Sequence, residues 1–157
     1  MNAQIISPSQ ANAGIGFSIP VNTVKKVVPE LIALGRYRHP WMGISFFPAG
    51  LNEGLSESFA ELGADVPNRG VMILRVESGS PAFEAGLKGG SRTIETPYGE
   101  LSVGGDVIVD IDGATIPTPR SLIAFLETNT LPGDTIQVTV LRGDETLTVS
   151  VTLGERQ

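Results

Sequence analysis

The amino-acid sequence predicts an α+β fold that is rich in short β-strands and has a few helices. Its 19 glycines and 11 prolines are spread along the 157 residues at intervals, as in a protein whose strands are separated by tight turns. Residues 136–141 and 147–153 alternate apolar and polar side chains as strands do. Between residues 22 and 34, apolar residues instead recur at helical spacing. The length favours a packed domain, because a chain of about 150 residues buries roughly two-thirds of its unfolded surface.

Composition and charge exclude several classes of protein. The absence of cysteine excludes disulfides, thiolate metal sites and thiol nucleophiles. With 11 basic and 17 acidic residues the net charge is -6, the wrong sign for a surface that binds nucleic acid or anionic lipid. No apolar run approaches the roughly 20 residues of a membrane span. The single histidine, His39, lies in a polar stretch, residues 35–40, that we interpret as a connector between two segments.

The segment before this connector predicts a hairpin and one helix. Two apolar runs, residues 5–6 and 15–19, form the expected hairpin around a long polar loop. The helix after the hairpin has Asn22 as its expected N-cap and Gly35 as its C-cap, and Pro29 should bend it. These elements are too few for a core. The segment therefore either packs on the residues after the connector or belongs to a domain whose remainder lies elsewhere.

The segment after the connector begins with strands and short helices. The expected elements are a strand, an amphipathic helix, a second strand, and a turn with a short helix, over residues 41–47, 55–62, 70–76 and 78–87. Pro48 should stop the first strand. The short helix carries three local signals, with Ser80 as N-cap, Pro81 at the first helical position and Gly86 at the end.

The remaining residues predict further strands and one more helix. The expected elements are a hairpin, a strand, a helix starting near Pro119 and two alternating strands, with the strands over residues 91–103, 106–111, 136–141 and 147–153. Asp112-Gly113 marks a tight turn, and residues 142–145 join the last two strands. The second segment is therefore α+β, with about five or six strands and three helices.

The order of these pieces resembles a known family. The matching motifs are Gly70-Val71-Met72-Ile73, Ser80-Pro81-Ala82, Ala85-Gly86-Leu87, Gly105-Asp106-Val107-Ile108 and Ile111-Asp112-Gly113. They resemble the PDZ domain of HtrA/Deg-type serine proteases. Upstream, residues 12–22 resemble the last strand of the trypsin-like protease domain of that family, and residues 23–34 resemble its C-terminal helix. The resemblance implies a PDZ domain over residues 36–157, a small β-sandwich or partly open barrel with two or three short helices. Residues 1–35 would be the end of a trypsin-like barrel.

The resemblance implies no catalysis by this chain alone. In the family, the catalytic His and Asp and the loop of the nucleophilic Ser all precede the segment that corresponds to residue 1. Gly89-Gly90-Ser91 is not that loop, because it follows a short helix, and Ser80 has no general base in sequence reach. Asp106, Asp110 and Asp112 share one strand face, but the Glu that closes a calcium loop is absent. We expect no catalytic residue, no metal and no cofactor, although a hydrolase with an unanticipated arrangement is an alternative.

The resemblance also locates a candidate binding site. Trp41-Met42-Gly43-Ile44 resembles the PDZ loop whose backbone N–H groups bind a peptide's C-terminal carboxylate. Glycine is expected there because a Cβ would obstruct the ligand. The peptide would add as an antiparallel strand beside residues 45–47, which include Ser45 and Phe46. Opposite it, the family pattern turns Pro119, Ile123 and Leu126 to the groove and Leu122 and Phe125 to the core. The alternative is a buried strand that happens to contain glycine.

These residues imply a peptide-binding region of an HtrA/Deg-like serine endopeptidase. Because the groove positions are apolar, we expect hydrophobic C-termini or unfolded segments as partners, delivered to the protease domain or regulating it in protein quality control. No nucleic-acid partner is expected. The alternative is a domain that holds a homo-oligomer together, with its groove occupied by a neighbouring subunit. The family implies an extracytoplasmic location, periplasmic or at the cell surface, with a membrane tether upstream.

Overall fold

The structure is a computed structural model, and it describes residues 2–4, 17–46, 69–96 and 99–156. The chain divides into two compact units, residues 1–38 and 39–157, which are described separately. The assignment of residues 1–35 to the end of a trypsin-like domain stays a prediction. Among the described residues, none of the helices combines the length and the apolar character needed to cross a membrane.

The first unit contains a hairpin and one helix. Strand β1 (Asn2–Gln4) pairs antiparallel with β2 (Phe17–Ser18), whereas residues 5–16, including most of the apolar runs expected to form the hairpin, lie outside the described residues. Helix α1 (Val21–Leu34) ends, as predicted, at Gly35, whose φ is +71°. The prediction of Asn22 as N-cap is wrong, because the helix begins at Val21 after Pro20, and no side chain caps it.

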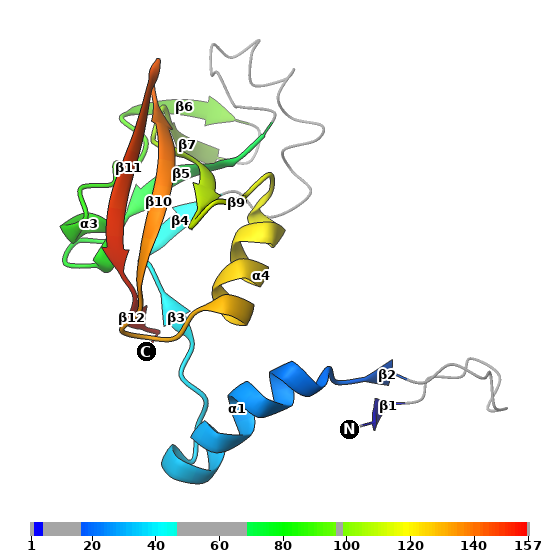
Figure 1. Cartoon of the computed structure of the whole chain (residues 1–157). Coiled ribbons are helices and arrows are strands. Elements are labelled where there is room, and N and C mark those ends of the chain that lie inside the picture. Colours follow the sequence, from blue (N-terminus) through cyan, green and yellow to red (C-terminus); the bar gives the residue numbers. More distant parts are fainter. Residues whose placement is uncertain (1, 5–16, 47–68, 97–98, 157) are drawn as a thin grey trace, which may run out of the picture. The chain divides into compact units, whose positions relative to one another are not determined.

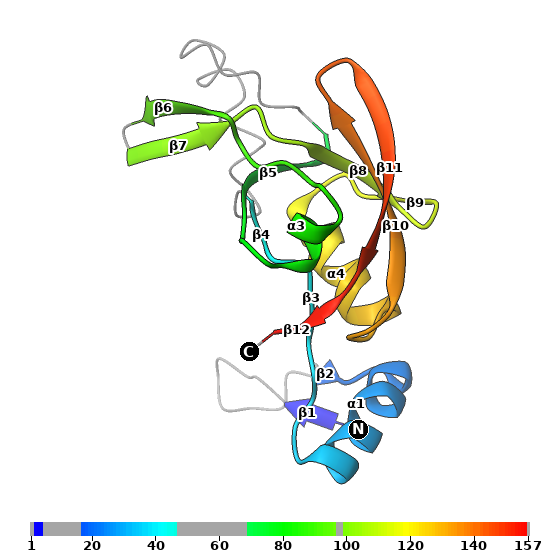
Figure 2. The same ribbon diagram turned by 90° about the vertical axis from the view of Figure 1, so that its left-hand side faces the viewer.

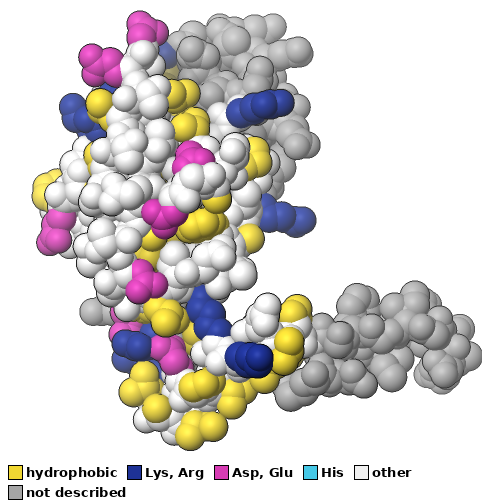
Figure 3. Space-filling model, viewed as in Figure 1, with side chains coloured by type: hydrophobic (Ala, Val, Ile, Leu, Met, Phe, Trp, Pro, Cys, Tyr) yellow, Lys and Arg dark blue, Asp and Glu magenta, His cyan; other side chains and the backbone are white. Residues whose placement is uncertain are grey.

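Helix α1 is amphipathic and has no buried residue. Its exposed apolar side chains are Val21, Val28, Leu31, Ile32 and Leu34, and Figure 3 shows hydrophobic side chains gathered along it. After the helix the chain turns back, so that Arg38 donates its backbone N–H to Glu30 Oε2 at 2.9 Å and its Nη2 to Glu30 Oε1 at 2.7 Å. These two hydrogen bonds lower the pKa of Glu30 below its ordinary value.

The second unit is built on an open antiparallel sheet (Figure 1). Its strand order is β11-β10-β8-β5-β4, with the short β9 paired to β8. The strands are β4 (Ile44–Phe46), β5 (Val71–Val76), β8 (Val107–Ile111), β9 (Ala114–Thr115), β10 (Thr135–Arg142) and β11 (Glu145–Thr152). The α+β prediction is thereby confirmed. Because the described sheet ends at β4 on one side, β4 is an edge strand.

Two smaller strand pairs complete the unit. Strands β6 (Arg92–Thr96) and β7 (Gly99–Val103) form the predicted hairpin, which projects from the main sheet (Figure 2). It packs on a small apolar cluster of its own around Met72 and Val103. Strands β3 (Pro40–Trp41) and β12 (Gly154–Glu155) form the other pair, and the sequence analysis did not anticipate β12.

Both described helices of this unit begin where the sequence predicts. Ser80 caps α3 (Pro81–Glu84) by accepting the N–H of Phe83 at 3.2 Å. Thr118 caps α4 (Pro119–Asn129) through a capping box with Ser121. Helix α4 packs beside β3 and buries Leu122 in the main core. The helix predicted over residues 55–62 lies outside the described residues.

The main core follows from alternation in the strands. In β10 the side chains of Ile136, Val138 and Val140 are all buried, while the residues between them are at least partly exposed. They meet the buried isoleucines of β8 and valines of β5 and β11. The prediction of one continuous strand over residues 41–47 is wrong for the described residues 41–46. The chain forms β3, turns at Met42-Gly43, where Gly43 has a φ of +79°, and resumes as β4.

A buried ion pair fastens this core to the segment after α3. Asp106 is 1% exposed and accepts hydrogen bonds from Arg142 Nε and Nη2, both at 2.7 Å, and from the N–H of Lys88 at 2.8 Å. Arg142 also donates to the carbonyl of Gly86 at 2.8 Å. The hydrogen bond to Asp106 raises the pKa of Arg142 above its ordinary value. The carboxylate is therefore a structural ion-pair partner.

We expect the Asp106→Asn variant to lose about 2 kcal/mol of its free energy of unfolding, because Asp106 is buried and the amide NH2 of Asn would face the Arg142 or Lys88 donors, which a carboxylate accepts. Urea unfolding of the full chain measures the loss. The matched control is Asp144→Asn in the exposed β10–β11 turn, which should change stability by less than about 0.5 kcal/mol. Equal unfolding midpoints for the two variants would contradict the role given to Asp106.

Candidate functional site

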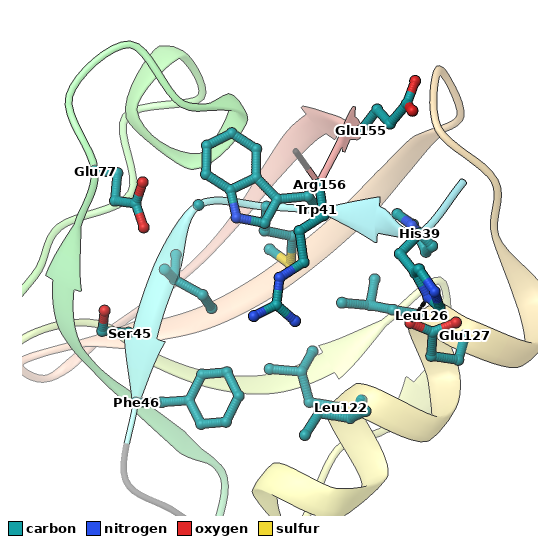
Figure 4. A pocket seen from close by; sticks show the side chains of 15 residues that line it. His39, Trp41, Ser45, Phe46, Glu77, Leu122, Leu126, Glu127, Glu155 and Arg156 are labelled. Atoms are coloured by element: carbon teal, nitrogen blue, oxygen red, sulfur yellow. Dashed lines mark hydrogen bonds and ion pairs between the residues drawn. The ribbon is translucent and has the colours of Figure 1, made fainter. Parts of the chain in front are cut away.

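A pocket of about 740 Å³ opens between the edge strand β4 and helix α4 (Figure 4). One wall is the continuous stretch of residues 39–46, and the other is the face of α4 that carries Leu122, Ile123 and Leu126. Glu77, Glu127 and residues 155–156 complete the lining. The volume lies within the range of about 300–1,000 Å³ that is usual for ligand pockets.

Most residues that the sequence analysis assigned to the site lie around this pocket. The lining includes Trp41, Met42, Gly43, Ile44, Ser45, Phe46, Ile123 and Leu126. Pro119, which we expected to face the groove, is buried at the start of α4 and does not line it. Leu122 belongs to the core, as expected, and also forms part of the wall. The binding role of these residues stays a prediction.

Hydrogen bonds fix the direction of the backbone in the loop between β3 and β4. The carbonyl of Met42 accepts the N–H of Ala82 at 2.9 Å, and the carbonyl of Gly43 accepts the N–H of Glu77 at 2.9 Å. In a trans peptide the N–H points opposite to the carbonyl of the preceding residue. The N–H groups of Gly43 and Ile44 therefore point away from α3 and β5, and we infer that they face the pocket.

None of the described strands pairs with the outer edge of β4. Ile44 is opposite Val76 in β5, and the Glu77-to-Gly43 hydrogen bond brackets this pair. Because hydrogen-bonding groups alternate along an antiparallel strand, both backbone groups of Ile44 point away from β5. This edge borders the pocket and offers a donor and an acceptor to an additional strand.

Gly43 is needed for a reason that differs from our expectation. A Cβ on Gly43 would lie 2.1 Å from the Cβ of Ser80 and 2.6 Å from its Oγ. The obstruction is therefore internal. Ser80 is fully buried, and its Oγ donates to the Gly43 carbonyl at 3.3 Å while accepting the N–H of Phe83. The same side chain that caps α3 also supports the loop.

The pocket is also lined by charged residues, which the sequence analysis did not assign to the site. His39, interpreted as part of a connector, places Nδ1 2.9 Å from Glu127 Oε1 of α4. Arg156 donates its backbone N–H to the His39 carbonyl at 3.0 Å, and Figure 4 shows its guanidinium directed into the pocket. Glu77 and Glu155 are also on the rim. They come from segments far apart in sequence, so no local motif indicates them.

The described pocket residues do not show the geometry of a nucleophilic triad. A triad needs the hydroxyl within hydrogen-bond reach of the histidine. Figure 4 places Ser45 and His39 on opposite sides of the pocket, and the Ser45 side chain points away from it. The apolar floor consists of Met42, Leu122 and Leu126, of which Met42 is 2% and Leu122 1% exposed.

Comparison with known proteins gives a family match for the second unit. Residues 40–153 match the family model described as "PDZ domain". The chain is 37% identical over 153 residues to "Protease Do-like 1, chloroplastic" of Arabidopsis thaliana, with 98% of this chain and 31% of the relative covered. It is 33% identical over 149 residues to "Serine protease Do-like HtrA" of Bacillus subtilis (92% and 29% covered). A Rhizobium meliloti "Probable periplasmic serine endoprotease DegP-like" is 32% identical over 157 residues (98% and 26% covered).

Solved structures give the same result. The chain matches "HtrA-type protease AlgW with decapeptide" at a TM-score of 0.62 and 27% identity, covering all of this chain and 42% of that one. It matches "HtrA-type protease AlgW with tripeptide" at a TM-score of 0.59 and 26% identity, covering all of this chain and 45% of that one. The chain spans at most about a third of the length of the curated relatives named above.

We expect Gly43→Ala to destabilise the chain more than Gly79→Ala. Both glycines have a similar positive φ, +79° and +74°, so both variants lose about 1 kcal/mol of unfolding free energy to backbone strain. Nothing lies within 4 Å of a Cβ at Gly79, whereas a Cβ at Gly43 overlaps Ser80. Urea unfolding of both variants isolates the cost of that overlap, and equal losses would show that Ser80 does not fix the loop.

Proposed function

The chain belongs to the PDZ domain family in the form found in HtrA/Deg-type serine proteases, and from this we propose that its pocket binds peptide C-termini. The observation that carries the proposal is that β4 ends the described sheet beside the pocket, where we infer that the N–H groups of Gly43 and Ile44 face inward. An extended peptide can add to such an edge as an antiparallel strand, and its main-chain hydrogen bonds then supply affinity. The N–H groups of Gly43 and Ile44 would receive its terminal carboxylate.

The pocket floor favours a hydrophobic residue at the peptide's end. Met42 and Leu122 are almost completely buried, and Ile44, Phe46 and Leu126 pack against the same core. Burying a Val, Leu or Phe side chain on this floor contributes about 1.5–3 kcal/mol. The strand hydrogen bonds add to this contribution, and ordering of the peptide subtracts from it. We expect dissociation constants in the micromolar range, which correspond to a binding free energy of about -8 kcal/mol.

In a longer protein this binding would deliver unfolded substrates to a protease domain or regulate it. The proposal draws on the relatives, which are named as serine proteases, and on the solved neighbours, whose titles include a decapeptide and a tripeptide. An extracytoplasmic location is proposed by analogy with the relatives named as periplasmic. One relative is named as chloroplastic, so the compartment is not the same across the family.

Trp41 provides a direct test of the proposed binding. It is the only tryptophan of the chain and lines the pocket. We expect its fluorescence to change saturably with a short peptide that ends in Val or Phe, and the amidated peptide to bind at least about tenfold more weakly because the carboxylate is lost. Calorimetry checks the affinities. If neither peptide binds, the peptide-binding proposal is wrong, and light scattering would then test the alternative in which a second copy fills the groove.

We expect Ile123→Asp to weaken peptide binding by about tenfold or more, because Ile123 is 51% exposed where it lines the groove, and a carboxylate there opposes an apolar side chain. The matched control is Ala124→Asp, which adds the same charge at an exposed position of α4 that does not line the pocket. Circular dichroism and urea unfolding confirm that both variants fold. Equal peptide affinities in the two variants would contradict the groove.

A further inference from the structure

Arg156 stands out among the pocket residues because it is a cation over an apolar floor. Its backbone is anchored next to the pocket, since it follows β12 and donates to the His39 carbonyl at 3.0 Å. In Figure 4 its side chain passes Trp41, and its guanidinium is directed to the middle of the pocket between Phe46 and Leu126. The fold therefore fixes the origin of the side chain and leaves the charged end in the ligand space.

No carboxylate of the described part of the chain forms an ion pair with this guanidinium. Glu127, which lines the same wall, is 2.9 Å from His39. The described salt bridges join Arg38 to Glu30, His39 to Glu127 and Arg142 to Asp106. Arg142, by contrast, forms a bidentate ion pair with the carboxylate of Asp106. Arg156 has the same five donors, and Figure 4 shows its guanidinium directed into the pocket.

The charge around the pocket makes this cation important for an anionic ligand. Residues 39–157 contain seven Lys and Arg and sixteen Asp and Glu, a net charge of -9 with His39 neutral. Arg156 is the one Lys or Arg among the described residues that line the pocket, while Glu77, Glu127 and Glu155 all line it. A peptide that brings a carboxylate would be repelled by the unit as a whole unless a local cation met it.

We propose that Arg156 determines specificity by pairing with a carboxylate of the bound peptide, so that the groove selects acidic segments with a hydrophobic end. The inference rests on the proposed peptide binding and adds the ligand's charge to it. A guanidinium suits this role because its planar donors match a carboxylate in a two-pronged geometry. The carboxylate is either the peptide's terminus or an Asp or Glu side chain near it, and the two sources can be separated experimentally.

The experiment uses the full chain and four peptides of equal length that end in the same hydrophobic residue. Two carry Glu at the two preceding positions and two carry Gln, and each pair is made as free acid and as amide. We expect the wild-type chain to bind the peptide with the additional carboxylate about tenfold more tightly at low salt, either in the Glu-against-Gln comparison or in the free-acid-against-amide comparison. The difference should be smaller at high salt. In Arg156→Gln the preference for Glu over Gln should fall close to one if Arg156 pairs with a side-chain carboxylate. If Arg156 pairs with the terminus, the preference for the free acid should instead decrease, while the N–H groups of Gly43 and Ile44 retain the remainder.

The matched control is Arg120→Gln. Arg120 is exposed on α4 and does not line the pocket, so this variant changes the net charge equally without touching the ligand space. Arg156→Glu should reverse the preference and favour peptides with Lys in place of Glu. The proposal is overturned if Arg156→Gln leaves all four affinities unchanged, matches Arg120→Gln, or raises them, the last showing that Arg156 merely fills the pocket. If no peptide binds the wild-type chain, peptide binding itself fails, which is a distinct result.

Discussion

The contact between Asp106 and Arg142 joins β8 and β10 to the segment after α3, the helix on whose first residues the pocket loop rests. Asp106 immediately precedes β8, and Arg142 ends β10. Lys88 and Gly86, to which they also hydrogen-bond, come after α3. The backbone of Asp106 adds hydrogen bonds to Ile73 of β5 and to Lys88. Because the position of α3 is fixed in this way, Ser80 at its start can support the Gly43 carbonyl. The loop that lines the pocket is thus connected through α3 to an ion pair whose two residues do not line the pocket.

Local signals in the sequence were sufficient for the elements with strong caps and periodicity. Ser80 and Pro81 begin α3 where the capping pattern puts it, and the alternation in β10 and β11 gives strands of almost the expected length. Asn22 failed as a cap because the helix already starts at Val21, after a proline that needs no N–H partner. Strand β12 has only two residues, and its pairing with β3 spans more than a hundred positions, so no local pattern reveals it.

The candidate site likewise contains residues that the sequence predicts and residues that it does not. Its apolar residues follow from the family motif and from helical spacing, because the wall and floor come from two short continuous stretches of chain. Its charged rim is formed by tertiary contacts between residues that are far apart in the sequence. His39 meets Glu127 across 88 positions, and Arg156 reaches the pocket only because β12 lies against β3. Gly89 and Gly90 precede the predicted hairpin, and a Cβ on either would clash with the backbone of residue 75 or 102. Because those contacts are between residues distant in sequence, no local pattern shows why glycine is required there.

The pairing of β3 with β12 has a mechanical consequence. In the register, Pro40 is opposite Glu155 and Trp41 is opposite Gly154, so the chain enters and leaves this unit at adjacent points (Figure 1). Tension applied to residues 39 and 156 loads this two-residue ladder as a zipper, one rung at a time. Just beyond its outermost rung, the backbone N–H of Arg156 donates to the carbonyl of His39, where the pocket wall begins. A pull on these two residues would therefore open the ligand space before it strained the eight-residue strands of the core.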